Sequence, residues 1–268
     1  MMQRTAYSSN ITVMKSAVQK VAKGLIRDFG EIENLQVSRK GPADFVTNAD
    51  LRAEKLLHKL LAEARPSYGF LMEEGGEISS DEGRYRWIVD PLDGTNNFLH
   101  GFPMFAIAIA LEETLSSGKK QILASIIHSP ILQETFWAEK GKGAFAEDSY
   151  QRERRLRVSG RRELGDTLLN IGSITPDIIG DLMPKIAGIR CLGSTCMAMA
   201  YVAAGRLDGI IQLRGSKPWD IAAGKLLIEE AGGIVTNSNG GDDYIESASL
   251  ISANPIIHPQ LLDAIKQK

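Results

Sequence analysis

The run WIVDPLDGTNNF, residues 87–98, constrains this chain more than any other segment. Its first residues are apolar and β-branched, which predicts a buried strand. Pro91 has a fixed φ and no N–H, so we expect the strand to end there. Asp90 and Asp93 then lie on either side of a turn, and Gly94 allows a positive φ or a close backbone approach. Two carboxylates at a strand end, beside a possible helix N-terminus, suit a cation and a phosphate together.

A plain acidic turn is the alternative interpretation of that run, because Asp-Pro and Asp-Gly pairs are common turn formers. Acidic residues elsewhere weaken this alternative. Glu73 and Glu74 follow a predicted strand, where adjacent carboxylates are costly unless they are solvated or bound to cations. Asp50 precedes one predicted helix and Asp220 opens another, and for both of them N-capping is the alternative role.

Apolar spacing predicts two amphipathic helices, followed by closely spaced strands and then by strands that alternate with helices. The short links between the first strands favour an antiparallel sheet with the helices on one side, and the later order is that of α/β proteins. We expect two halves, residues 1–150 and 151–268, in one compact unit. The predicted helices cover residues 11–29, 50–65, 195–204, 221–231 and 259–266, and the predicted strands cover 69–72, 86–89, 105–111, 121–128, 134–138, 189–192, 208–213, 233–236 and 250–253.

Composition and charge argue against several classes of protein. A net charge of −2 and an aromatic content of 6% predict neither a polyanion-binding field nor a stacking platform for nucleic acid. The apolar stretch 102–111 is far shorter than the roughly 20 residues that cross a bilayer, and residues 1–10 lack a signal segment. We therefore expect a cytoplasmic protein with no membrane partner.

Cysteine and histidine give no sign of another chemistry. Cys191 and Cys196 have no nearby His or further Cys, which is typical of two free thiols. No Ser-His-Asp order is evident and the four histidines match no motif, so a covalent phospho-enzyme is not favoured. The arginine-rich stretch 152–162 is either a basic patch or, more commonly, a solvated connection.

The order of four motifs resembles the inositol monophosphatase superfamily. The motifs are D-x-x-T-x-x-D at residues 44–50, the glutamate pair at 73–74, the run at 87–98, and W-D-x-A-A-G at 219–224 with E-A-G-G at 230–233. The match spans nearly the whole chain. It implies a layered αβαβα sandwich that assembles as a homodimer, and a Mg²⁺-dependent, lithium-sensitive phosphatase acting on a small phosphorylated substrate.

The resemblance also implies roles for individual residues. The first half would carry most metal ligands, and the second would supply Asp220 and substrate contacts. Thr95 would pair with Asp50 to help activate a water, with Glu73 and Asp93 also in the catalytic set. Two or three Mg²⁺ ions would be held by Glu73, Asp90, Asp93, Asp220 and the carbonyl group of Leu92. Substrate contacts would come from the N–H groups of Gly94 and Thr95, which would hold the phosphate, and from Asp93, Gly193, Ser194, Thr195 and Asp220.

Two positions depart from the usual pattern of that superfamily. Met72 stands where a Gly commonly precedes the glutamate pair, which affects only local backbone freedom. Leu213, six residues before Trp219, stands where inositol-specific members usually carry a Glu that hydrogen-bonds ring hydroxyls. A leucine cannot accept those bonds, and such a polar contact can decide specificity. If the register of this segment is shifted by one residue, Gln212 or Arg214 would take the place of that Glu.

The favoured function is therefore hydrolysis of inositol 1-phosphate or a similar polyol or sugar phosphate by a metal-activated water. The same chemistry on histidinol phosphate, fructose 1,6-bisphosphate or a 3′-phosphoadenosine nucleotide is the first alternative. A non-enzymatic role as an RNA- or transcription-complex-associated partner is the second. Only the stretch 152–162 favours it, so a nucleic-acid partner is not expected.

Overall fold

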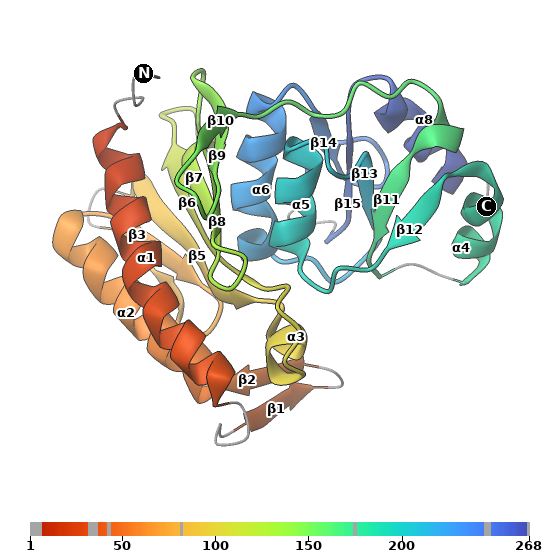
Figure 1. The fold of residues 1–268 in the computed structure, drawn as a ribbon. Coiled ribbons are helices and arrows are strands. Elements are labelled where there is room, and N and C mark those ends of the chain that lie inside the picture. Colours follow the sequence, from red (N-terminus) through yellow and green to blue (C-terminus); the bar gives the residue numbers. More distant parts are fainter. Residues whose placement is uncertain are drawn as a thin grey trace.

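The structure is a computed structural model that describes residues 7–31, 37–41, 44–80, 83–173, 176–243 and 248–266. Five layers follow one another across the molecule: a helix pair, an eight-stranded sheet, a second helix pair, a five-stranded sheet and outer helices (Figure 1). This αβαβα order confirms the predicted layered sandwich. Among the described helices, none combines the length and apolarity that crossing a bilayer requires.

The first layer consists of α1 (Ser9–Gly30) and α2 (Asn48–Ala64), whose apolar faces are buried against the first sheet. Each begins two residues earlier than the apolar spacing predicts, because a capping side chain sets the start. The Ser8 hydroxyl accepts the N–H of Ile11 at 3.3 Å, and the Thr47 hydroxyl accepts the N–H of Ala49 at 3.0 Å. The hairpin of β1 (Val37–Gly41) and β2 (Asp44–Thr47) leads into α2.

The eight-stranded sheet has the order β10-β9-β8-β7-β6-β5-β3-β4 and is antiparallel except where β3 pairs with β5. Its strands are β3 (Gly69–Met72), β4 (Gly76–Ile78), β5 (Tyr85–Asp93), β6 (Ala106–Thr114), β7 (Lys120–Ser129), β8 (Glu134–Glu139), β9 (Gly143–Glu147) and β10 (Glu153–Arg155). The last of these lies within the arginine-rich stretch, so part of that stretch is an edge strand.

The prediction that the central strand ends at Pro91 is wrong. Strand β5 continues to Asp93, and its pairing with β6 shifts register between Asp90 and Asp93. A shift of this kind is a bulge, where a residue without an N–H interrupts no ladder hydrogen bond. The bulge lets both aspartates belong to one strand end.

The expectation of helices on only one side of this sheet is also wrong. The helices α5 (Thr195–Ala203) and α6 (Pro218–Glu230) cover the face opposite α1 and α2. Along β6 the side chains of Ile107, Ile109 and Leu111 pack toward α1 and α2, whereas the alternate alanines pack toward α5 and α6. A strand that is apolar on both faces needs cover on both faces.

The five-stranded sheet has the order β12-β11-β13-β15-β14. It is parallel at β11 with β12 and with β13, and β15 is antiparallel to both of its neighbours. Its outer face carries α8 (Ile257–Lys266), with α4 (Pro176–Leu182) nearby (Figure 1). The strands are β11 (Leu168–Ile171), β12 (Gly188–Arg190), β13 (Gly209–Gln212), β14 (Ile234–Thr236) and β15 (Leu250–Ala253).

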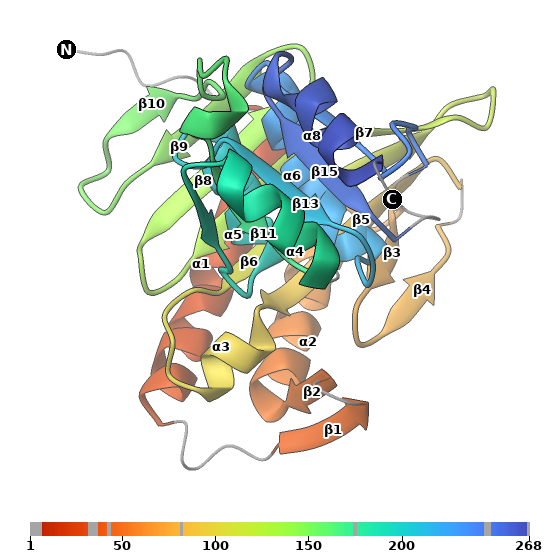
Figure 2. The same cartoon turned by 90° about the vertical axis from the view of Figure 1, so that its right-hand side faces the viewer.

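A short helix, α3 (Thr95–Leu99), follows β5 directly. Figure 2 shows α3 beside α2 and the β1–β2 hairpin, below the five-stranded sheet. The end of β5 therefore meets α2, α3 and the N-terminal ends of α5 and α6. Of these elements, β5, α2 and α6 carry acidic residues of the motifs.

Candidate active site

Asp90 and Asp93 are both buried at the end of β5. Asp90 accepts only a local bond among those resolved, from the N–H of Leu92 to its Oδ1 at 3.0 Å. Asp93 reaches the N-terminus of α5, where the N–H of Thr195 donates to Oδ1 at 3.2 Å and the N–H of Cys196 to Oδ2 at 2.8 Å. The Ser194 hydroxyl also donates to Oδ2. Asp93 thus joins the first sheet to α5, in a place where the helix dipole favours a negative charge.

Asp220 and Glu73 complete the acidic cluster. Asp220 is the third residue of α6 and accepts the N–H of Lys217 at 2.8 Å, so it serves the helix start without being the N-cap itself. Burial raises the pKa of Asp90 well above its ordinary value, and the charges of Glu73, Asp93 and Asp220 raise it further. Burial, with the charge of Asp93, raises the pKa of Asp220 to about 7. The four predicted carboxylates therefore lie close enough to repel one another.

Asp50 and Thr95 meet beside this cluster, as predicted from the resemblance. Asp50 is fully buried as the third residue of α2, and both the N–H of Thr47, at 2.9 Å, and the Thr47 hydroxyl donate to it. The Thr95 hydroxyl lies 3.1 Å from Asp50 Oδ1 and 3.2 Å from the carbonyl oxygen of Leu92. One hydroxyl has one proton, so Thr95 donates to one of these oxygens at a time. Burial raises the pKa of Asp50, and its hydrogen bonds act in the opposite direction.

The turn at Gly94 lies against the loop that precedes α5. Gly94 has a φ of 96°, and a Cβ there would lie 3.1 Å from the carbonyl oxygen of Met104 and 3.2 Å from that of Gly193. It would also lie 3.3 Å from the Cβ of Ser194. Only glycine combines this backbone conformation with so close an approach. The residues predicted to hold the phosphate are thus in contact with those predicted to face the rest of the substrate.

Asp44 and Glu74 are the other acidic positions of the sequence motifs. The side chain of Asp44, at the start of β2, lies outside the part of the chain that the structure describes. The backbone N–H of Glu74 donates to Glu54 Oε2 at 2.8 Å, which fixes the turn after β3. Glu54 is itself buried on α2, one turn after Asp50.

Sequence reasoning missed Cys196 as a neighbour of the carboxylates. Asp90, Asp93 and Cys196 each place a potential ligand atom within 4.8 Å of the other two. Burial, reinforced by the nearby carboxylates, raises the pKa of the Cys196 thiol well above its ordinary value, and the thiol donates to the carbonyl oxygen of Asp220. The spacing between Cys191 and Cys196 does not predict this position, because the place where α5 starts determines where the Cys196 side chain lies. Both cysteines are free.

The register of β13 decides which residue faces the predicted substrate segment. The side chain of Leu213 packs against the apolar cluster of the second sheet, with Leu169 and Ile211. Gln212 instead accepts a hydrogen bond from the Thr195 hydroxyl at 3.3 Å and donates to the Ser216 hydroxyl at 2.8 Å. Of the two substitutes that the sequence offered, Gln212 is the one that lies beside Thr195.

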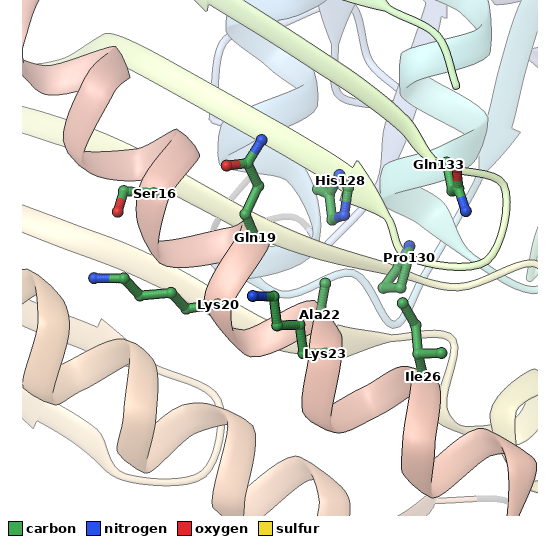
Figure 3. Close-up of a pocket in the computed structure, with 9 residues that line it drawn as sticks. All are labelled: Ser16, Gln19, Lys20, Ala22, Lys23, Ile26, His128, Pro130 and Gln133. Carbon is green, nitrogen blue, oxygen red and sulfur yellow. The ribbon is translucent and has the colours of Figure 1, made fainter. Parts of the chain in front are cut away.

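A separate cavity of about 420 Å³ lies between α1 and the turn from β7 to β8 (Figure 3). Its wall includes Gln19, Lys20, Lys23 and Gln133, together with His128, whose pKa burial lowers to about 4. None of its nine lining residues is a predicted site residue or carries a carboxylate. This cavity is distinct from the acidic cluster.

Comparison with known proteins agrees with the fold. The profile of the inositol monophosphatase family matches residues 7–268. The chain is 45% identical to an inositol-1-monophosphatase of Mesorhizobium japonicum, over 98% of each chain, and 38% identical to a putative Nus factor SuhB of Neisseria meningitidis, over 93% of this chain and 95% of that one. A crystal structure of the extragenic suppressor protein suhB from Bartonella henselae superimposes with a TM-score of 0.90 at 45% identity, over 97% of this chain and 99% of that chain.

The family match and the named relatives identify a phosphoric monoester hydrolase of a metal-using class. The chain belongs to the inositol monophosphatase family.

Proposed function

We propose that this protein hydrolyses a small phosphate monoester in a Mg²⁺-dependent reaction, with inositol 1-phosphate or a similar polyol phosphate as substrate. The observation that carries the proposal is that Asp90 and Asp93 are buried side by side and that the half-buried Asp220 lies close enough to repel Asp90, next to the hydrogen-bonded pair of Asp50 and Thr95. Like charges so close together are unfavourable in the protein interior unless a cation or protons offset them.

The donor set fits Mg²⁺, which prefers hard oxygen ligands. Glu73, Asp90, Asp93, Asp220 and the Leu92 carbonyl group would hold two or three ions. The raised pKa values of Asp90 and Asp220 support this assignment, because a divalent cation would offset both the burial and the mutual repulsion that raise them. When bound, Mg²⁺ would lower the pKa of a water molecule and offset the charge that develops on the leaving oxygen. The Cys196 thiol stays protonated and is not a suitable ligand for this ion.

The side chains of Thr95 and Asp50 would handle the proton of the attacking water. While the Thr95 hydroxyl donates to Asp50 Oδ1, at 3.1 Å, its own lone pairs are free to accept a hydrogen bond from that water. Asp50 would receive the proton through this hydroxyl, and its raised pKa favours that role. The N–H groups of Gly94 and Thr95, at the start of α3, would hold the phosphate oxygens.

The remaining part of the substrate would lie against residues 193–195, with Asp93 and Asp220 also in contact. Gln212 precedes the position where inositol-specific relatives usually carry a Glu, and its neutral amide accepts a hydrogen bond from the Thr195 hydroxyl. A neutral amide both donates and accepts, so it can pair with hydroxyl groups. This supports a polyol substrate in spite of Leu213.

A screen of phosphate release with Mg²⁺ over inositol 1-phosphate, histidinol phosphate, fructose 1,6-bisphosphate and a 3′-phosphoadenosine nucleotide tests the proposal. We expect inositol 1-phosphate among the fastest substrates and inhibition by Li⁺. Gln212→Leu should raise KM for it by about tenfold, because one polar contact contributes roughly 1 to 1.5 kcal/mol. Gln212→Glu is the matched control that keeps an acceptor. If inositol 1-phosphate is among the slowest substrates, the assignment to inositol fails.

A second, non-enzymatic role is supported by the relative named a putative Nus factor. The arginine-rich stretch adds little support for nucleic-acid binding, because several of its side chains have partners within the chain. Arg152 pairs with Asp148 at 2.7 Å, and Arg161 pairs with Asp208 at 3.1 Å. We therefore propose the phosphatase, acting as a homodimer, as the primary function.

A further inference from the structure

The loop before α5 is held from both halves of the chain by two asparagine side chains. Asn97, on α3, donates through its Nδ2 to the carbonyl oxygen of Leu192 at 2.7 Å. Asn170, on β11, accepts the N–H of the same Leu192 at its Oδ1, at 3.0 Å. Both hydrogen-bonding groups of residue 192 are therefore satisfied by side-chain amides, one used as a donor and the other as an acceptor.

The Asn97 amide also ties this loop to the phosphate end of the site. The second proton of its Nδ2 is donated to the carbonyl oxygen of Met104 at 2.6 Å, the same carbonyl group that crowds Gly94. A Cβ on Gly193 would lie 2.7 Å from Asn97 Oδ1, and Gly193 has a φ of 70°. A single side chain thus contacts Met104, Leu192 and Gly193, which belong to segments distant in the sequence.

Asp93 provides the other link between β5 and this loop, but its carboxylate is also a proposed metal ligand. If Asp93 holds a cation, its bonds to Ser194, Thr195 and Cys196 would weaken, because the carboxylate would share its charge with that cation. The two asparagines are neutral, so their bonds to Leu192 do not depend on whether a cation is present. They can hold the loop in one position through the reaction cycle.

We propose that Asn97, opposed by Asn170, is a positioning residue that sets where residues 193–195 stand relative to Gly94 and Thr95, and hence where the hydroxyl-bearing part of the substrate lies. This inference rests on the proposed phosphatase function. It adds a specificity-determining contact that touches neither the phosphate nor a metal ligand.

Replacing each of the two asparagines by aspartate tests this inference, because an aspartate carboxylate accepts hydrogen bonds but donates none. Asn97→Asp removes both donors and places a carboxylate against two carbonyl oxygens, whereas Asn170→Asp keeps the acceptor for the Leu192 N–H. For Asn97→Asp we expect KM for inositol 1-phosphate to rise by about tenfold, the equivalent of one to two lost hydrogen bonds. Its kcat should change by less than about threefold, and Asn170→Asp should stay within about twofold of wild type in both constants.

Inorganic phosphate, as a competitive inhibitor, provides the internal control, since it probes only the Gly94 and Thr95 end. Its Ki should stay within about twofold of wild type in both variants. An equal rise of KM and of the phosphate Ki in Asn97→Asp would overturn the inference. So would a loss in Asn170→Asp as large as that in Asn97→Asp.

Amide hydrogen exchange of the peptide containing residues 192–195 supplies a readout that needs no substrate. Exchange there should rise in Asn97→Asp, with and without Mg²⁺, and unchanged exchange contradicts the inference. Asn97→Ala, which adds no charge, serves if the aspartate variant does not fold, and the same rise is expected. If wild type hydrolyses no polyol phosphate, the proposed function fails while the exchange result still decides the role of Asn97.

Discussion

At its acidic end the site has Asp90 and Asp93 buried and Asp220 half-buried, whereas at its other end two neutral side-chain amides hold Leu192, at the start of the segment 192–195. Repulsion among the carboxylates opposes folding at neutral pH, and raised pKa values are its signature. The amide end has complementary donors and acceptors and needs no ligand. The comparison supports the proposal that a bound cation would organise one end, while the fold itself organises the other.

The largest expected effect is at the acidic end. Asp90→Asn removes a charge from the cluster but keeps an acceptor for the N–H of Leu92, so the local turn survives. We expect Mg²⁺-dependent activity to fall by about 10³-fold, as when preorganised charge is removed from other sites. The stability of the metal-free variant should equal or exceed that of wild type in urea unfolding with EDTA.

Asp90 is a better choice for this test than Asp93, because Asp93 also accepts three bonds at the start of α5. A loss of folding in Asp93→Asn would therefore not separate metal binding from packing. Full activity in Asp90→Asn would refute the assignment of the acidic end.

A smaller effect is expected where the two ends meet, at Thr95. Thr95→Ala removes the hydroxyl that lies 3.1 Å from Asp50 Oδ1, and kcat should fall by about 10²-fold, the lower range for loss of general acid–base catalysis. Thr95→Ser keeps the hydroxyl and should retain most activity. Mg²⁺ affinity measured by titration calorimetry should be unchanged in both, and a matched loss in the serine variant would argue against the hydroxyl's role.

The smallest expected effect is on stability against pH. The pKa of Asp220 is raised from 3.8 to about 7 in the folded protein, so its protonated form is favoured there. The contribution of the Asp220 carboxyl to the free energy of unfolding is fully present below about pH 4 and is lost as the pH rises through about 7. Between pH 5 and 8 in EDTA, Asp220→Asn should lose about 2 kcal/mol less stability than wild type, because about two pH units, at roughly 1.4 kcal/mol each, separate pH 5 from the folded pKa and partial exposure reduces the product.

Urea unfolding at the two pH values measures this difference. Because His128 titrates in both proteins, its contribution cancels. Mg²⁺ should reduce the pH dependence of wild type more than that of the variant. Equal pH dependence in the two metal-free proteins would mean that the acidic end is not under the repulsion described above.

The elements and acidic positions could be predicted from local sequence because their causes are local. Helix starts follow from capping and apolar period to within two residues, whereas the end of β5 at Asp93 depends on its pairing with β6. The second helix layer could not be predicted in this way, although the uninterrupted apolar run 105–111 carried the signal for cover on both faces.

The amide contacts at residues 192–195 had no such signal. Asn97 lies in the run 87–98, but its acceptors, Met104 and Leu192, are brought to it only by packing. The same holds for Cys196, whose place beside Asp93 follows from where α5 starts.

The sequence by itself determined the acidic residues of this site and the elements that carry them, since spacing along one chain sets which residues end a strand or begin a helix. Tertiary structure alone decided the substrate end. Successive residues of a strand point to opposite faces, so the packing of Leu213 into the second sheet's core is what leaves Gln212 beside Thr195. A one-residue shift would exchange their places, and only the packed core excludes it.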